Sequence, residues 1–129
     1  MTGEPIWIDA DVALAVHDRQ LAEHGGAQGV RDAGLLESAL ARPRNQWDYG
    51  QPDLLALAAA YAFGIARNHP FADGNKRTAW VMARLLLALN GVRLDYTPEA
   101  AIAIVLALAA GELSENELTE WFREHVRPA

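Results

Sequence analysis

Three stretches of the chain are almost entirely apolar, and they limit most strongly how it can fold. Residues 54–66, 79–89 and 100–110 consist mainly of alanine and leucine, which are strong helix formers. Each stretch is shorter than the ~18 residues that a helix needs to cross a bilayer, and the second contains Arg84. Because helices that are apolar on every side belong inside a bundle, we expect these three to form the core of an all-α protein.

Helices of mixed polarity are expected around this core. Asp9 can cap a helix that reaches about residue 23, and Asp32 can cap a shorter helix that ends near residue 40, before Pro43. Pro52 suits the first turn of the helix that contains residues 54–66. Residues 6–8 and 92–94 can be extended, but they are too short to determine the fold class.

The C-terminal third of the chain carries clear signals for where helices start. Thr97 and Pro98 can open a helix that Gly111 ends, and Ser114 with Glu117 has the capping-box pattern for a last helix reaching about residue 126. The chain has 129 residues and no linker-like segment, which predicts a single domain over residues 1–129.

Charge and cysteine content exclude several classes of protein. Eleven Lys+Arg and seventeen Asp+Glu give a net charge of −6, which disfavours diffuse binding to nucleic acids or anionic lipid. We therefore expect no direct nucleic-acid partner and no membrane partner. The absence of cysteine excludes disulfides, Cys-ligated metals and thiol nucleophiles. The chain starts without a basic stretch leading into an apolar run, so a cytoplasmic location is expected.

The residues suited to chemistry are concentrated in segment 69–78, between the first two apolar stretches. Pro70 and Gly74 interrupt the helical pattern, which predicts a loop that enters a helix near Lys76. The start of that helix would present free N–H groups and the positive end of the helix dipole. Lys76, which is the only lysine, and Arg77 add two cations, and Asn75 adds an amide. This combination predicts a phosphate site.

Two further residues of this segment suggest what happens to the phosphate. Asp73 would repel phosphate unless a divalent ion such as Mg²⁺ lay between them. His69 precedes it by four residues, and an imidazole is a suitable general base for a hydroxyl nucleophile. Each residue alone is common in loops, but their combination indicates a functional phosphate site. The Walker A pattern and the kinase glycine-rich loop are both absent.

The run His-Pro-Phe-Ala-Asp-Gly-Asn-Lys-Arg-Thr at residues 69–78 resembles the signature of the Fic/Doc (Fido) superfamily. The Asn-Lys-Arg-Thr-Ala ending is similar to the death-on-curing (Doc) branch, whereas the nucleotide-transferring Fic branch has glycine in place of Lys76. Residues 14–18, 25–40 and 90–92 are also similar to Doc-type proteins. The resemblance implies a Fic/Doc-type bundle of about six helices with a short flap near the active site.

The resemblance also implies roles for the residues of the motif. His69 would deprotonate the target hydroxyl, Asp73 would hold Mg²⁺, and Phe71 would pack into the core and support the loop. The phosphates of ATP would be bound by four consecutive residues: Gly74, Asn75, Lys76 and Arg77.

Three functions are compatible with this resemblance. The Doc branch resembles toxins of type II toxin–antitoxin systems, kinases that phosphorylate elongation factor Tu and stop translation. That implies phosphate transfer from ATP to a protein hydroxyl. The preference for this reaction depends on Lys76, whose side chain fills space that glycine would leave. Adenylyl transfer, the Fic-type reaction, stays open, because Gly74 stands where some Doc-like toxins carry alanine and Pro70 also matches Fic proteins. The third alternative is an inactive partner that only binds an antitoxin.

Restraint of the enzyme is expected from another chain. Many Fic proteins are held inactive by a helix of their own with the pattern Ser/Thr-x-x-x-Glu followed by Gly or Asn. This pattern does not occur in the sequence. A separate, Phd-like antitoxin is therefore expected to bind as a helix along an apolar groove.

Residues outside the motif give less definite signals. Segment 25–34 is either the flap that guides the target or a plain connection between helices, with Gly26, Gly29 and Arg31 as candidate flap or substrate residues. Arg31 would reach phosphate or pair with a neighbouring acid. His17 with Asp18 has the form of a metal phosphohydrolase dyad, but the further ligands are missing, so helix packing is favoured.

Overall fold

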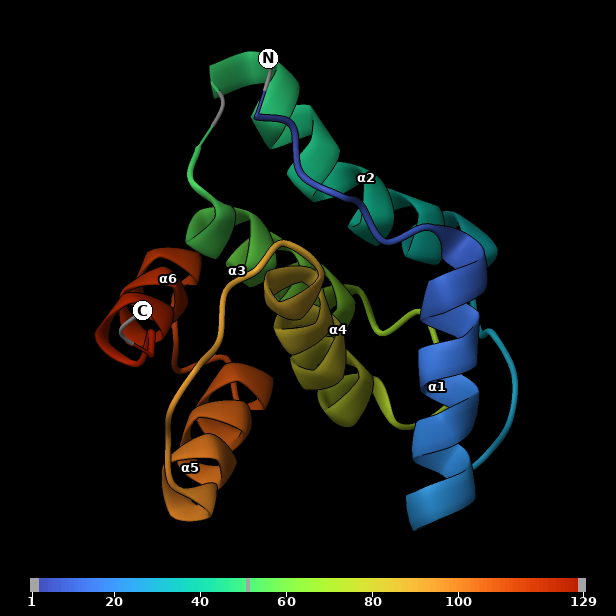
Figure 1. Ribbon diagram of the computed structural model, residues 1–129. Helices are drawn as coiled ribbons and strands as arrows, with labels where there is room; N and C mark the ends of the chain where they lie inside the picture. Colours follow the sequence, from blue (N-terminus) through green and yellow to red (C-terminus); the bar gives the residue numbers. More distant parts are fainter. Residues whose placement is uncertain (1–2, 51, 128–129) are drawn as a thin grey trace.

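The computed structural model describes residues 3–50 and 52–127, which contain six α-helices and no β-strand. α3 lies in the middle of the bundle and packs against α2, α4, α5 and α6, while α1 packs against α4 and α2 (Figure 1). The expected all-α bundle of about six helices is confirmed. None of the helices in the described residues is both long and apolar enough to span a membrane. The helices are α1 (Ala10–His24), α2 (Ala33–Gly50), α3 (Leu54–Asn68), α4 (Asn75–Leu89), α5 (Pro98–Ala109) and α6 (Glu115–Glu124).

Two of the three apolar stretches form most of the core, as expected, whereas the third contributes only one face to it. Ten of the fifteen residues of α3 are buried, and α4 contributes a further buried face. α5 instead lies at the edge of the bundle (Figure 1) and buries only Ile104 and Leu108. Ile102 and Leu106 are 61% and 57% exposed. Uniformly apolar composition cannot tell which side of a helix is covered, so α5 leaves an apolar face open.

Most helix starts follow the predicted caps. The side chains of Asp9 and Thr97 accept hydrogen bonds from the first turns of α1 and α5. Ser114 and Glu117 form the full capping box of α6, and the hydrogen bonds from Ser114 lower the pKa of Glu117. α3 differs, because its cap is Asp53, so Pro52 precedes the helix instead of lying in its first turn.

The expected end of α2 before Pro43 is wrong, because the helix continues to Gly50 with the proline inside it. Pro43 has no N–H to donate within the helix, which normally ends or kinks it. Here Pro43 is buried on the same face as Leu36, Ala39 and Leu40, and this face packs against α3. Burial of that apolar face outweighs the missing hydrogen bond.

Gly64 of α3 lies where α3 approaches α2 closely. A Cβ atom added at Gly64 would lie 3.2 Å from the backbone Cα of Ala39. We expect Gly64→Leu to lower the free energy of unfolding by about 1–3 kcal/mol, because it overpacks this contact. Gly50→Leu is the matched control, since nothing lies within 4 Å of the added Cβ there. Equal urea midpoints for the two variants would contradict this packing.

Candidate active site

The motif segment connects the two central helices of the bundle. α3 ends at Asn68, and His69 follows in the left-handed conformation, with φ 50° and ψ 55°. Gly74 is also left-handed, with φ 77°, and α4 starts directly after it. Since most of α3 and one face of α4 are buried, the loop is held on a rigid support.

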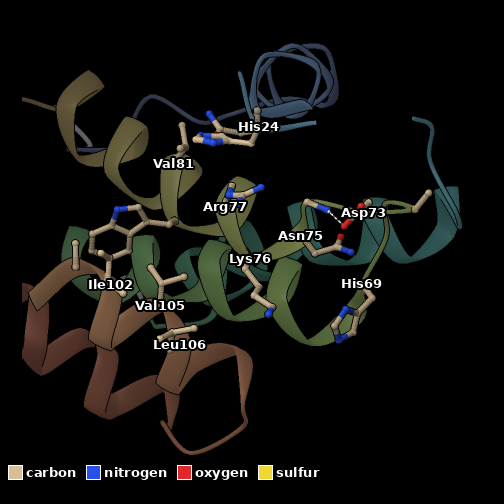
Figure 2. Close-up of a pocket in the computed structure, with 15 residues that line it drawn as sticks. His24, His69, Asp73, Asn75, Lys76, Arg77, Val81, Ile102, Val105 and Leu106 are labelled. Atoms are coloured by element: carbon tan, nitrogen blue, oxygen red, sulfur yellow. Dashed lines mark hydrogen bonds between the residues drawn. The ribbon is translucent and has the colours of Figure 1, made fainter. Parts of the chain in front are cut away.

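A cavity of about 790 Å³ opens over this loop (Figure 2). It brings together His69, Asp73, Lys76 and Arg77 with residues that the sequence had not assigned to the site. These come from the end of α1, from the next turn of α4 and from the exposed face of α5: Gln20, His24, Trp80, Val81, Ala101, Ile102, Val105 and Leu106. Trp80 and Val81 follow Lys76 and Arg77 by four positions each, and residues four apart share a helix face. This spacing is the sequence signal that could have placed Trp80 and Val81 in the site.

The first turn of α4 has the features of an anion site. Gly74 occupies the cap position, and no side chain there accepts a hydrogen bond from the N–H groups of the first turn. Lys76 and Arg77 are exposed and line the cavity, and Figure 2 shows their side chains leaving the helix in different directions. Among the described residues, neither forms an ion pair. The start of α4 and these two cations together are suited to binding phosphate.

Asp73 presents its carboxylate at the edge of this site. Its Oδ1 accepts a hydrogen bond from Gly74 N–H at 2.8 Å, and its Oδ2 accepts one from Ala27 N–H at 3.4 Å. Over residues 3–50 and 52–127, no group of three or more His, Cys, Asp or Glu side chains could hold a metal ion. A lone, exposed carboxylate beside a phosphate site fits Mg²⁺, which is often bound by one or two carboxylates together with substrate phosphates.

The side chain of Asn75, which is expected to bind phosphate, is hydrogen-bonded within the loop. Its Nδ2 donates to the Phe71 carbonyl and its Oδ1 accepts from the Phe71 N–H, both at 3.0 Å. The amide therefore closes the loop, which leaves the main-chain N–H of Asn75 for an anion. Phe71 is 1% exposed and lies in the core cluster.

His17 supports the loop from α1, a contact that the sequence did not reveal. Its ring is 1% exposed and stacks on Phe71, with 3.8 Å between ring centroids. Its Nε2 lies 2.8 Å from the Asp73 carbonyl oxygen, at hydrogen-bonding distance. The packing role favoured for His17 is thus observed, and it extends to the backbone of Asp73. In the sequence, the one sign that His17 would be buried is its position four residues after Ala13, on the same helix face.

The segment between α1 and α2 is attached to the motif loop by main-chain hydrogen bonds. Ala72 N–H donates to the Gly29 carbonyl at 3.0 Å, and Val30 pairs with Phe71 as an isolated antiparallel bridge. An added Cβ at Gly26 would lie 2.8 Å from Asp73 Oδ2, whereas Gly29 has open space. The segment therefore lies directly against the candidate metal ligand.

Arg31 is placed differently from either expectation. Its Nε donates to the His69 carbonyl at 2.8 Å, and its Nη2 donates to the Asn68 carbonyl at 3.0 Å. In the described part of the chain it pairs with no acid. The guanidinium is thus bound to the end of α3.

Comparisons with known proteins agree with this site. Residues 7–87 match the family model described as Fic/DOC family. The chain is 34% identical over 117 residues to "Protein kinase doc" of Escherichia phage P1, which covers 90% of this chain and 92% of that protein. It is 51% identical over 73 residues to "Toxin Doc" of Mycolicibacterium smegmatis, covering 54% and 55% of the two chains. The chain belongs to the Fic/DOC family.

Proposed function

We propose that this chain is a Doc-like toxin that transfers the terminal phosphoryl group of ATP to a hydroxyl group of a target protein. The observation that carries the proposal is the single cavity in which His69, Asp73, Lys76 and Arg77 meet at the start of α4. The similarity to proteins named Protein kinase doc and Toxin Doc supports it.

The geometry suggests how the residues divide the work. The first-turn N–H groups of α4, with Lys76 and Arg77, would hold the phosphates and stabilise charge as it develops. Asp73 would hold Mg²⁺, which supplies further neutralisation of the phosphates. His69 would accept the proton of the target hydroxyl while the oxygen bonds to the terminal phosphorus. The bond from that phosphorus to the bridging oxygen breaks, and ADP leaves.

Lys76 is the basis for proposing phosphoryl rather than adenylyl transfer. Lys76 lies in the first turn of α4 and lines the cavity. A glycine at this position would leave room for the backbone to approach the attacked phosphate. We propose that the lysine makes the nucleotide lie with its terminal phosphate towards His69. Elongation factor Tu is the proposed target.

We propose that an antitoxin, a separate protein, inhibits the enzyme. The cavity continues over the open face of α5, where Ile102 and Leu106 are exposed. Such a surface suits the apolar face of a helix, so a Phd-like antitoxin helix bound there would lie beside the nucleotide site.

The reaction can be tested with ATP labelled in the α or the γ position, Mg²⁺ and purified elongation factor Tu. We expect protein-bound label from γ-labelled ATP alone, because only the terminal group is transferred. Label from the α position would establish adenylyl transfer instead. If neither label is transferred, the remaining alternative is an inactive protein that only binds an antitoxin. The His69→Ala variant, which should transfer neither label, is the control for contaminating kinases.

A further inference from the structure

We propose that Arg31 is a positioning residue that fixes the backbone of His69 in the conformation from which its imidazole acts. The proposal rests on the role of His69 proposed above. Arg31 comes from the segment between α1 and α2, about forty positions away from the base along the chain. In the described part of the chain, its hydrogen bonds to the site all go to main-chain carbonyls.

His69 needs to be held, because the left-handed backbone conformation is uncommon and costly for residues other than glycine. With φ 50° it is the only non-glycine residue with a positive φ in the described part of the chain. Such a conformation persists only where the surroundings determine it. Its own N–H, donated to the Ile65 carbonyl at 3.2 Å, continues the helical pattern of α3 and leaves the following peptide groups to be fixed by other residues.

Arg31 supplies that restraint to three consecutive peptide groups. Its Nη2 and Nε donate to the carbonyls of Asn68 and His69, and its main-chain N–H donates to the Pro70 carbonyl at 2.7 Å. One residue therefore binds the carbonyl before the base, that of the base itself and the one after it. Rotation of the His69 backbone towards a more common conformation would break these bonds.

An arginine is well suited to this position. The last carbonyls of α3 have no partner within the helix and carry the negative end of its dipole. A guanidinium offers several N–H donors in a fixed plane and can bind two neighbouring carbonyls at once. Lysine, with a compact ammonium on a flexible stem, would keep the charge but lose this fixed geometry.

The proposal predicts that Arg31→Ala lowers kcat by about 10- to 100-fold, since small misplacements of a reacting group are costly. The Kd for ATP should change less than about twofold, because the phosphate-binding residues of α4 keep their places. Arg31→Lys should have an intermediate kcat. Arg67→Ala is the matched control: it removes a guanidinium from the same helix end, where it lies 5.2 Å from the centre of the Phe63 ring, and should leave kcat unchanged.

Two further measurements separate positioning from a general loss of structure. In a His69→Ala background, Arg31→Ala should lower the rate no further, because Arg31 acts through the base. In NMR spectra, the intact protein should show a strong NOE between the amide and α protons of His69, as a positive φ requires. This NOE should weaken in Arg31→Ala. It should also weaken in Arg31→Lys, which keeps the charge and can be used for the measurement if Arg31→Ala does not fold.

The proposal is overturned if the NOE of His69 is unchanged in both variants, or if the Kd for ATP rises in step with the fall in kcat. The second result would mean that Arg31 binds the nucleotide. Because the NOE is measured without nucleotide or target, it tests Arg31 even if the protein transfers no phosphate. Failure of the proposed function and failure of this inference are therefore distinguishable.

Discussion

Replacing His69 with alanine is expected to lower the rate of transfer by about 100- to 10,000-fold, the usual contribution of a general base. ATP should still bind with its original Kd, because the first turn of α4 and the cations of Lys76 and Arg77 are unchanged. Single-turnover transfer from γ-labelled ATP measures the rate, and calorimetric titration measures the binding. His69 is exposed and its ring lines the cavity, so the substitution leaves no buried gap.

A second substitution separates the loss of the base from a change of the loop. His69→Asn removes the imidazole, yet asparagine tolerates the left-handed conformation better than most residues. Both variants should be equally slow and should no longer arrest growth when produced in cells. If the intact chain and these variants slow growth equally, His69 is not the base of a toxic enzyme.

Gly26→Ala is expected to impair the site through Asp73. Its φ of 127° is unfavourable for alanine, and the added Cβ would lie 2.8 Å from Asp73 Oδ2 and 3.0 Å from Leu21 Cδ2. The carboxylate must therefore move away from its hydrogen bond with Ala27 N–H. Displacing a metal ligand through its supporting contacts typically costs 10- to 100-fold in metal affinity or activity. We expect a loss of about this size, with a raised Mg²⁺ concentration for half-maximal transfer.

Gly25→Ala is the matched control for this prediction. Gly25 also has a positive φ, 77°, but nothing lies within 4 Å of an added Cβ. It therefore has the backbone strain without the contact to Asp73, and its Mg²⁺ dependence should stay near that of the intact protein. Identical Mg²⁺ dependence in the two variants would show that the carboxylate is not the metal ligand.

The sequence predicted the helices and the motif loop well, because their signals are local. Caps such as Asp9 and Ser114 act within one turn, and Gly74 breaks the helical pattern where the phosphates are proposed to bind. The open face of α5 and the continuation of α2 through Pro43 could not be predicted, because burial depends on which neighbours cover a helix. Composition showed that α5 was apolar, but only the fold shows that its outer face is open.

Within the site, residue types can be predicted from the sequence, but the partners of their side chains cannot. Asn75 has the chemistry to bind phosphate, and only the structure shows that its amide is already paired with the Phe71 main chain. His17 and Arg31 act on the loop from far along the chain, through carbonyl oxygens that carry no sequence signal. Such contacts depend on how α1 and the following segment pack against α4.

A crystal structure with Mg²⁺ and a non-hydrolysable ATP analogue would test the central claim most directly. The terminal phosphate should lie on the first turn of α4 beside Lys76 and Arg77, with Mg²⁺ on the Asp73 carboxylate and the His69 imidazole facing the terminal phosphorus. An analogue bound outside this cavity, or one whose α-phosphate faces His69 while its terminal phosphate points away, would contradict the account.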